Sequence, residues 1–138
     1  MSTYKAPLDD LRFALFDVLD AEALFQRLGH AEVNRELIDA VLDEAARFTE
    51  TVLAPLNRVG DEVGCTFDRD TGEVAPPPGF KQAFDQFVEG GWTGLTNAPE
   101  HGGQGMPAVL GGVLTEMVDS ANLAWGNFPM LSHGAVQA

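Results

Sequence analysis

The longest regular pattern in the sequence is a run of apolar residues between Ala31 and Val63. They recur every three or four positions, at Val33, Leu37, Val41, Ala45, Phe48, Val52, Leu56, Val59 and Val63. This spacing puts them on one face of an α-helix and predicts a single long amphipathic helix. Pro55 lies inside the pattern and has no backbone N–H, so we expect a kink or a break near Leu53 to Pro55.

Shorter helical patterns lie on both sides of this segment. Upstream, residues 8–18 have helical spacing, and residues 21–28 are predicted to form a short helix between Asp20 as cap and Gly29 as terminator. Downstream, a helix from Phe80 to Val88 is expected to stop at Gly90 and Gly91. Further helices are predicted from Pro107 to Ala121 and from about Leu123 onward.

No segment alternates with the period of two that is typical of a strand, and Cys65 to Gly79 contains three consecutive prolines, Pro76 to Pro78. We therefore expect a surface loop at 65–79 and an all-α helical bundle. With 138 residues the chain has room for one ordinary domain. The expected division is an N-terminal extension over 1–30 and a helical domain over 31–138.

Eight Lys and Arg against 21 Asp and Glu give a formal net charge of −13. This balance makes a nucleic-acid or anionic-membrane partner a poor hypothesis. Cys65 is the only cysteine, which excludes an internal disulfide and fits a reducing compartment. The first twenty residues lack the pattern of a signal peptide, and no stretch is typical of a membrane span, so we expect a cytoplasmic protein.

The segment from Ser120 to Ala138 contains no Asp, Glu, Lys or Arg. Its apolar side chains are expected to meet another protein surface, because a patch of this kind is rarely left in open solvent. Its helical pattern has no C-terminal Gly, Pro or basic last turn, so we expect a domain that is truncated at Ala138 and incomplete at its C-terminal end.

Single residues give little support for catalysis. Cys65 has no neighbouring His, no Ser occupies a nucleophile elbow, and the three histidines, His30, His101 and His133, do not form a metal-binding motif. The adjacent carboxylates Asp9–Asp10, Asp43–Glu44 and Asp61–Glu62 diverge on a helix and are interpreted as solvated faces. The glycine-rich loop Pro99–Gly105 could bind a phosphate through its amides, but a tight turn between helices is the favoured interpretation.

Three motifs taken together resemble the N-terminal helical domain of acyl-CoA dehydrogenases. They are Gly91-Trp92-Thr93-Gly94-Leu95, Pro99-Glu100-His101-Gly102-Gly103-Gln104-Gly105 and Leu114-Thr115-Glu116-Met117. The opening Tyr4 to Phe13, with Glu44 to Phe48 and Leu53 to Asn57, is similar to the larger bacterial branch of this family, of the methylmercaptopropionyl-CoA dehydrogenase type. The resemblance covers nearly the whole chain.

The resemblance implies an FAD enzyme that converts an acyl-CoA thioester to the trans-enoyl-CoA with a glutamate base and passes electrons to an electron-transferring flavoprotein. It also implies a homo-oligomer. The base and most flavin contacts belong to later parts of such proteins, so no catalytic residue is assigned here, Glu100 and Glu116 included. Cofactor-binding residues stay unassigned, and FAD is not expected to be bound to these 138 residues alone.

By the same resemblance, Leu123 to Leu131 matches the stretch that lines the closed end of the acyl-tail pocket. Trp125, Phe128, Pro129 and Leu131 are therefore predicted tail contacts, with packing against the next helix or domain as the alternative. For Trp92 the favoured interpretation is an aromatic that locks a helix end into the core. Two other functions stay open, an acyl-CoA oxidase and a non-catalytic interaction module that binds a partner through Ala121 to Ala138.

Overall fold

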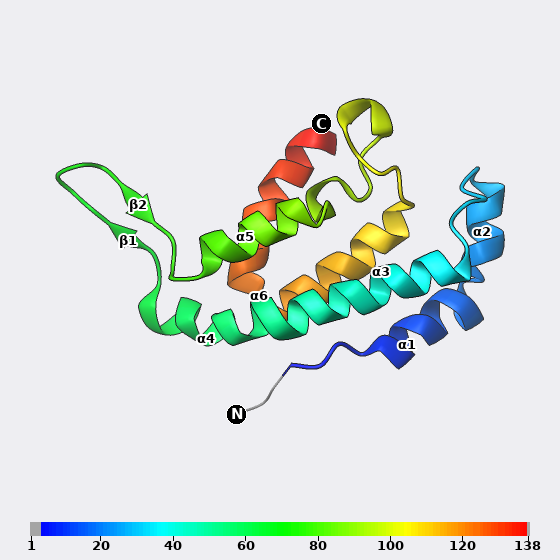
Figure 1. Cartoon of the computed structure of the whole chain (residues 1–138), viewed down its shortest axis with the longest axis horizontal. Coiled ribbons are helices and arrows are strands. Elements are labelled where there is room, and N and C mark those ends of the chain that lie inside the picture. The colour runs from blue at the N-terminus through cyan, green and yellow to red at the C-terminus, as the bar shows by residue number, and fades with distance from the viewer. Residues whose placement is uncertain (1–3, 138) are drawn as a thin grey trace.

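The computed structural model describes residues 4–137 as a helical protein (Figure 1). The elements are α1 (Leu8–Arg12), the π-helix η1 (Phe13–Val18), α2 (Ala21–Arg27), α3 (Arg35–Phe48), the π-helix η2 (Thr49–Leu53), α4 (Ala54–Val63), β1 (Thr66–Phe67), β2 (Val74–Ala75), α5 (Phe80–Glu89), the 3-10 turns η3 (Trp92–Gly94) and η4 (Pro99–His101), and α6 (Ala108–Gln137). The expected all-α fold is confirmed.

The predicted long helix is formed by α3, η2 and α4, which follow one another without a loop. The predicted irregularity is also present, because the five residues before α4 are wound as a π-helix just ahead of Pro55. The hydroxyl of Thr49 donates to the carbonyls of Ala45 and Ala46 at 2.9 and 3.1 Å, and that of Thr51 donates to Arg47 at 2.6 Å. These side chains satisfy carbonyls where the regular helical ladder is interrupted.

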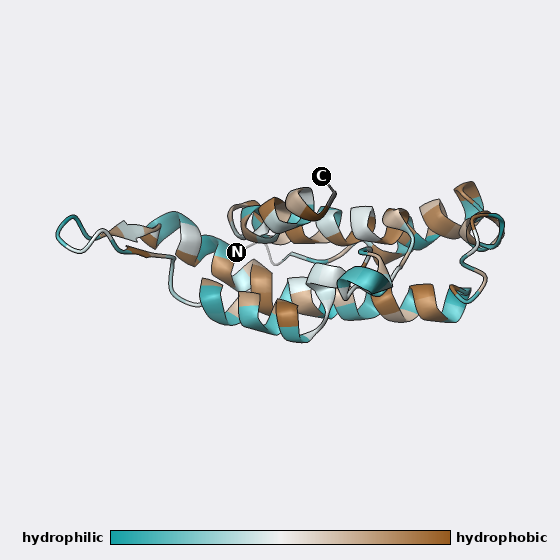
Figure 2. Cartoon of the chain, turned by 90° about the horizontal axis from the view of Figure 1, so that it is seen from above, coloured by the Kyte–Doolittle hydropathy of each residue, from teal (hydrophilic) through white to brown (hydrophobic). Residues whose placement is uncertain are grey.

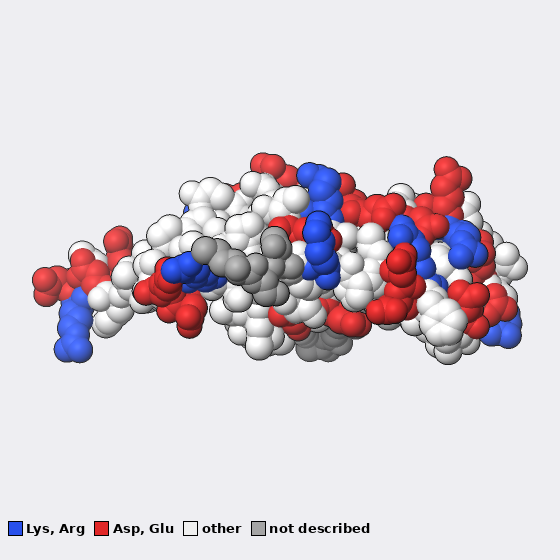
Figure 3. Space-filling model, turned by 90° about the horizontal axis from the view of Figure 1, so that it is seen from below, with Lys and Arg blue, Asp and Glu red and all other residues white. Residues whose placement is uncertain are grey.

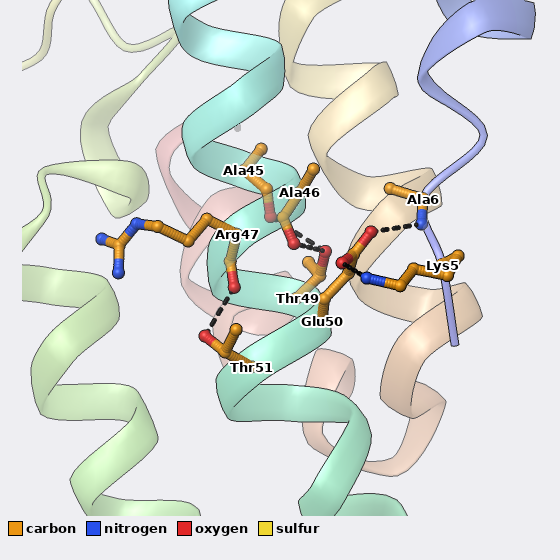
Figure 4. Close-up of polar contacts among 8 residues, drawn as sticks. All are labelled: Lys5, Ala6, Ala45, Ala46, Arg47, Thr49, Glu50 and Thr51. Carbon is orange, nitrogen blue, oxygen red and sulfur yellow. Dashed lines mark hydrogen bonds and ion pairs between the residues drawn. The ribbon is translucent and has the colours of Figure 1, made fainter. Parts of the chain in front are cut away.

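The N-terminal segment lies against this π-helix (Figure 4). The carboxylate of Glu50 accepts from Nζ of Lys5 at 2.6 Å and from the backbone N–H of Ala6 at 3.0 Å. These two bonds lower the pKa of Glu50 below its ordinary value, the Lys5 bond having the larger effect. Glu50 therefore attaches the start of the chain to the middle of the long helix.

Residues 8–28 contribute to the core through Leu11, Leu15, Ala21 and Phe25, all buried. Gly29 ends α2 as predicted, with a φ of +88° and the N–H of His30 donating to Phe25 at 2.8 Å. Asp20 is at the predicted cap position, but it has a left-handed φ of 47° and its side chain makes no capping bond. The buried side chains of this N-terminal part thus belong to the same apolar core as those of the helices that follow.

The segment 65–79 differs from the prediction of a loop without strands. Thr66 pairs with Ala75 and Phe67 with Val74, which makes a two-residue antiparallel ladder. The carboxylate of Asp68 accepts from the N–H groups of Asp70 and Thr71, and this turn returns the chain between the two short strands. The hairpin projects from the end of α4 beyond the bundle (Figure 1).

The helix α5 begins and ends close to the predicted positions, and Gly91 after it has a φ of +76°. The helix α6 begins at Ala108, one residue after the predicted start at Pro107. The two downstream segments that the sequence predicts as helices form the two arms of α6, over 108–121 and 123–137, joined at the non-helical residue Asn122. No helix within residues 4–137 combines the length and the apolar character that a membrane crossing requires.

On the face shown in Figure 3, acidic side chains are spread over the surface and several basic side chains lie beside them. The guanidinium of Arg12 pairs with Asp39 and Asp43, each at 2.7 Å, and so ties α1 to α3. By contrast, the turns of α6 near the C-terminus carry exposed hydrophobic residues (Figure 2), of which Leu131 is 73% exposed and Met130 56%.

Candidate functional site

Asn122 makes the bend in α6. Its side-chain oxygen accepts from the N–H of Trp125 at 3.0 Å, which is an N-cap for the second arm. Its amide nitrogen donates to the backbone carbonyl of Leu53 at 3.2 Å, at the end of the π-helix η2. Asn122 is 1% exposed, so one buried amide both starts the second arm and fixes its corner to the long helix.

Trp125 lies one turn beyond this corner and is fully buried. Its indole Nε1 donates to the backbone carbonyl of Phe80 at 3.1 Å. The ring centres of Phe87 and Phe48 lie 5.3 and 6.0 Å from the indole in edge-to-face arrangements, and that of Phe84 lies 6.4 Å away. This cluster holds the second arm in place.

A groove of about 640 Å³ is lined by residues of both arms of α6. This volume is within the range of small-molecule sites. The first arm contributes the lining residues Ala108, Gly111, Gly112, Leu114, Thr115, Val118 and Asp119, and the second arm contributes Gly126, Pro129, Met130 and His133. The other lining residues are Phe87, Trp92, Thr93, Leu95 and Thr96. The lining is mainly apolar with Asp119 as its one carboxylate.

A second hollow, of about 390 Å³, lies on the other side of the second arm. It is open to solvent and is lined by Gly60, Gly64, Cys65, Pro77, Phe80, Ala124, Asn127, Phe128 and Leu131. The second arm therefore has a hollow on each side.

The four predicted tail contacts lie in three different places in the structure. Pro129 lines the groove, whereas Phe128 and Leu131 line the second hollow. Trp125 lines neither and lies in the core. Trp92 is half-buried, packs against the core and also lines the groove, which fits the predicted role at a helix end and adds a position on the site.

The glycine-rich loop at 99–105 is a closed turn. The N–H groups of Gly103, Gln104 and Gly105 donate to the carbonyls of Ala98, Gly94 and Asn97 at 2.8 to 3.1 Å. A Cβ on Gly103 would lie 2.1 Å from the carbonyl oxygen of Asn97. Because its amides are used within the protein, the loop offers no cradle for a phosphate, in agreement with the favoured interpretation as a tight turn.

The titratable side chains give no metal centre within residues 4–137, where no group of three or more His, Cys, Asp or Glu residues is suitably arranged. Cys65 is exposed at the rim of the second hollow. His133 lines the groove, and His101 lies 3.7 Å from Glu100 on the surface.

The roles of Asn122 and of the groove glycines were not predicted from the sequence. A signal for Asn122 was available, since Asn is a favoured N-cap and an apolar helical run follows it. The glycines gave no such signal, because only the bend brings Gly126 opposite Gly111 and Gly112.

Fold and groove together describe an all-α domain with a mainly apolar groove, of the size of small-molecule sites, along the bent helix α6. No family model matches the chain, but two curated relatives align with nearly all of it. The chain is 38% identical over 136 residues to 3-methylmercaptopropionyl-CoA dehydrogenase of Ruegeria pomeroyi, with 99% of the chain and 23% of that protein aligned. It is 32% identical over 127 residues to the broad-specificity linear acyl-CoA dehydrogenase FadE5 of Mycobacterium tuberculosis, with 90% of the chain and 20% of that protein aligned.

The resemblance to acyl-CoA dehydrogenases is thereby confirmed, and the chain is homologous to a part of these enzymes. It spans about a fifth of the length of the two relatives.

Proposed function

We propose that the chain is the N-terminal helical part of a flavin-dependent acyl-CoA dehydrogenase, which forms a trans-enoyl-CoA from an acyl-CoA thioester. The observation that carries this proposal is the 38% identity to a named acyl-CoA dehydrogenase over 99% of the chain. The all-α architecture agrees with the helical domain that the family resemblance implies.

In this proposal the chain supplies scaffold and one side of the pocket for the acyl tail. The groove supports this role because its volume of about 640 Å³ and its mainly apolar lining suit a flexible hydrocarbon. Pro129 and Met130 are the proposed tail contacts on the second arm. The family resemblance also names Trp125 as a tail contact. Trp125 is fully buried and does not line the groove, which favours a role in supporting the second arm. Phe128 and Leu131 would contact the tail only if it occupies the second hollow.

The glycine-rich loop 99–105 offers no pyrophosphate cradle, because the amides of Gly103, Gln104 and Gly105 donate to carbonyls within the protein. We therefore assign FAD and the glutamate base to other parts of the complete enzyme and derive no step through the flavin from these residues. An electron-transferring flavoprotein, a homo-oligomeric state and a cytoplasmic location complete the proposal.

A second function is a non-catalytic module that binds a partner protein through residues 121–138. The exposed apolar side chains of the second arm, such as Leu131 at 73%, favour this alternative. An acyl-CoA oxidase has the same chemistry on the substrate and differs in passing electrons to oxygen.

The test is to express the complete reading frame that contains this chain. The complete protein is expected to purify with FAD, to lose its flavin absorbance when acyl-CoA is added without oxygen, and to release enoyl-CoA in the presence of an electron-acceptor dye. Hydrogen peroxide formation in air would identify the oxidase. Binding of a partner protein with no flavin and no acyl-CoA turnover would support the interaction module and overturn the proposal.

A further inference from the structure

Three glycines line the groove, and two of them have a structural reason to be glycine. A Cβ on Gly111 would lie 2.8 Å from Cγ2 of Thr96, and a Cβ on Gly126 would lie 2.3 Å from Oδ1 of Asp119. Both distances are shorter than real contacts, so a side chain at either position would force neighbouring groups apart.

Gly112 has no such reason. A Cβ there would meet no heavy atom within 4 Å, and its φ is not in the left-handed region. It lies inside the first arm of α6, where glycine lowers helix stability relative to alanine. Neither packing nor backbone geometry within the described residues explains a glycine at this place.

The position of Gly112 supplies a reason, because this residue lines the groove. We infer that Gly112 is a specificity-determining residue that leaves space for the far part of the acyl tail. This inference rests on the proposed function, since it assigns the tail to the groove.

The residues around Gly112 also indicate which chemical groups can bind next to it. The hydroxyl of Thr115 donates to the carbonyl of Gly111 at 2.9 Å, so its proton is already used. Leu114 and Val118 are apolar neighbours on the same arm and line the groove as well. A wall with these properties suits unsubstituted methylene groups and offers little to a polar substituent.

The test compares Gly112→Leu with Gly134→Leu in the complete protein. Gly134 is a suitable control because it lies in the second arm of the same helix, a Cβ there also meets nothing within 4 Å, and it lines neither hollow. The measurement is kcat/KM over a series of saturated acyl-CoAs from four carbons upward, together with Tm.

A leucine at 112 is expected to displace about three methylenes of the tail. Each buried methylene contributes about fourfold to binding, so kcat/KM for the longest substrates should fall by about 60-fold while that for four carbons changes by less than about threefold. Gly134→Leu should keep the wild-type profile. Gly112→Ala is the milder variant, with an expected loss of about fourfold on the longest substrates and a Tm at or above that of the wild type.

An unchanged profile in Gly112→Leu, or an equal loss at every chain length, would overturn the inference, and the equal loss would show that Gly112 faces another part of the protein. In both cases wild-type activity would leave the proposed function intact. If the wild-type protein oxidises no acyl-CoA, the proposed function itself fails and the inference fails with it.

Discussion

The side-chain amide of Asn122 donates to the backbone carbonyl of Leu53 across 3.2 Å, although 69 positions separate the two residues in the sequence. The bond joins the bend of α6 to the π-helix of the long helix. The direction of the second arm, and with it the shape of the groove, therefore depends on this contact.

We predict that Asn122→Ala lowers the free energy of unfolding by about 2 to 4 kcal/mol, because it removes an N-cap and leaves the Leu53 carbonyl without its donor. Asn122→Ser should cost less, since its hydroxyl is a favoured N-cap that can accept from the N–H of Trp125 without burying a charge. Urea unfolding followed by circular dichroism measures both. Asn127→Ala, on the exposed side of the same arm, is the control, and an equal loss in that variant would contradict the assigned role.

Trp125→Ala is predicted to lower the free energy of unfolding by about 3 to 5 kcal/mol, because it empties a buried position among three phenylalanine rings. Trp125→Phe should cost less and reports mainly the loss of the bond to Phe80. The same variants in the complete enzyme test the predicted tail contact. A shift of the preferred acyl length would assign Trp125 to the pocket, and an equal loss at all lengths would assign it to the scaffold.

The Lys5–Glu50 contact predicts a pH dependence. The pKa of Glu50 is lowered in the folded protein, so its ionised form stabilises the fold above the ordinary glutamate pKa of about 4.3, and this contribution is lost as the pH falls through the lowered folded pKa. The Tm difference between wild type and Glu50→Gln should thus be constant near neutral pH and shrink below about pH 4.

The measurement is repeated in a Lys5→Gln variant, because this change removes the larger of the two contacts that lower the pKa of Glu50. In that background the effect of Glu50→Gln on Tm should be smaller at neutral pH. A Tm difference between wild type and Glu50→Gln that does not change with pH would contradict the role of the carboxylate.

Gly103→Ala is predicted to destabilise the protein by about 1 to 3 kcal/mol or more, because the new Cβ would lie 2.1 Å from the carbonyl oxygen of Asn97. Gly134→Ala should instead stabilise it by about 0.5 to 1 kcal/mol, since that helical position is open. Thermal unfolding of the two variants beside the wild type measures the contrast. A tolerated Gly103→Ala would show that the 92–106 segment is held less tightly than the structure indicates.

The 138-residue chain is predicted to self-associate through the second arm, where Met130 and Leu131 are 56% and 73% exposed. Sedimentation equilibrium of the double variant Met130→Glu and Leu131→Glu should show a monomer. Val88→Glu, which changes an exposed apolar residue on α5, should behave as the wild type. A wild-type chain that stays monomeric at all concentrations would contradict this prediction.

Local sequence patterns predicted the helices well, because each has an apolar face of regular spacing and a clear end. The long helix and its irregularity before Pro55 follow from such signals, as does the stop at Gly29. The two-residue ladder at Thr66–Phe67 and Val74–Ala75 was not predictable in the same way. Strands this short have no periodicity, and the turn at Asp68 forms through backbone amides that any residue supplies.

The candidate site was predictable only in part. The family resemblance names Pro129, Phe128 and Leu131 together as tail contacts, whereas the structure puts Pro129 on the groove and the other two on the second hollow. Neighbouring residues on one helix point in different directions, and the assignment depends on the bend at Asn122. That bend results from a contact with Leu53 that no local pattern contains.

The most direct test of the account is a structure of the complete protein with a non-hydrolysable, unreactive acyl-CoA analogue bound. The account predicts that the acyl tail lies in the groove between the two arms of α6, against Gly112 and Met130. A groove filled by side chains of the same polypeptide, with the tail bound elsewhere, would contradict it.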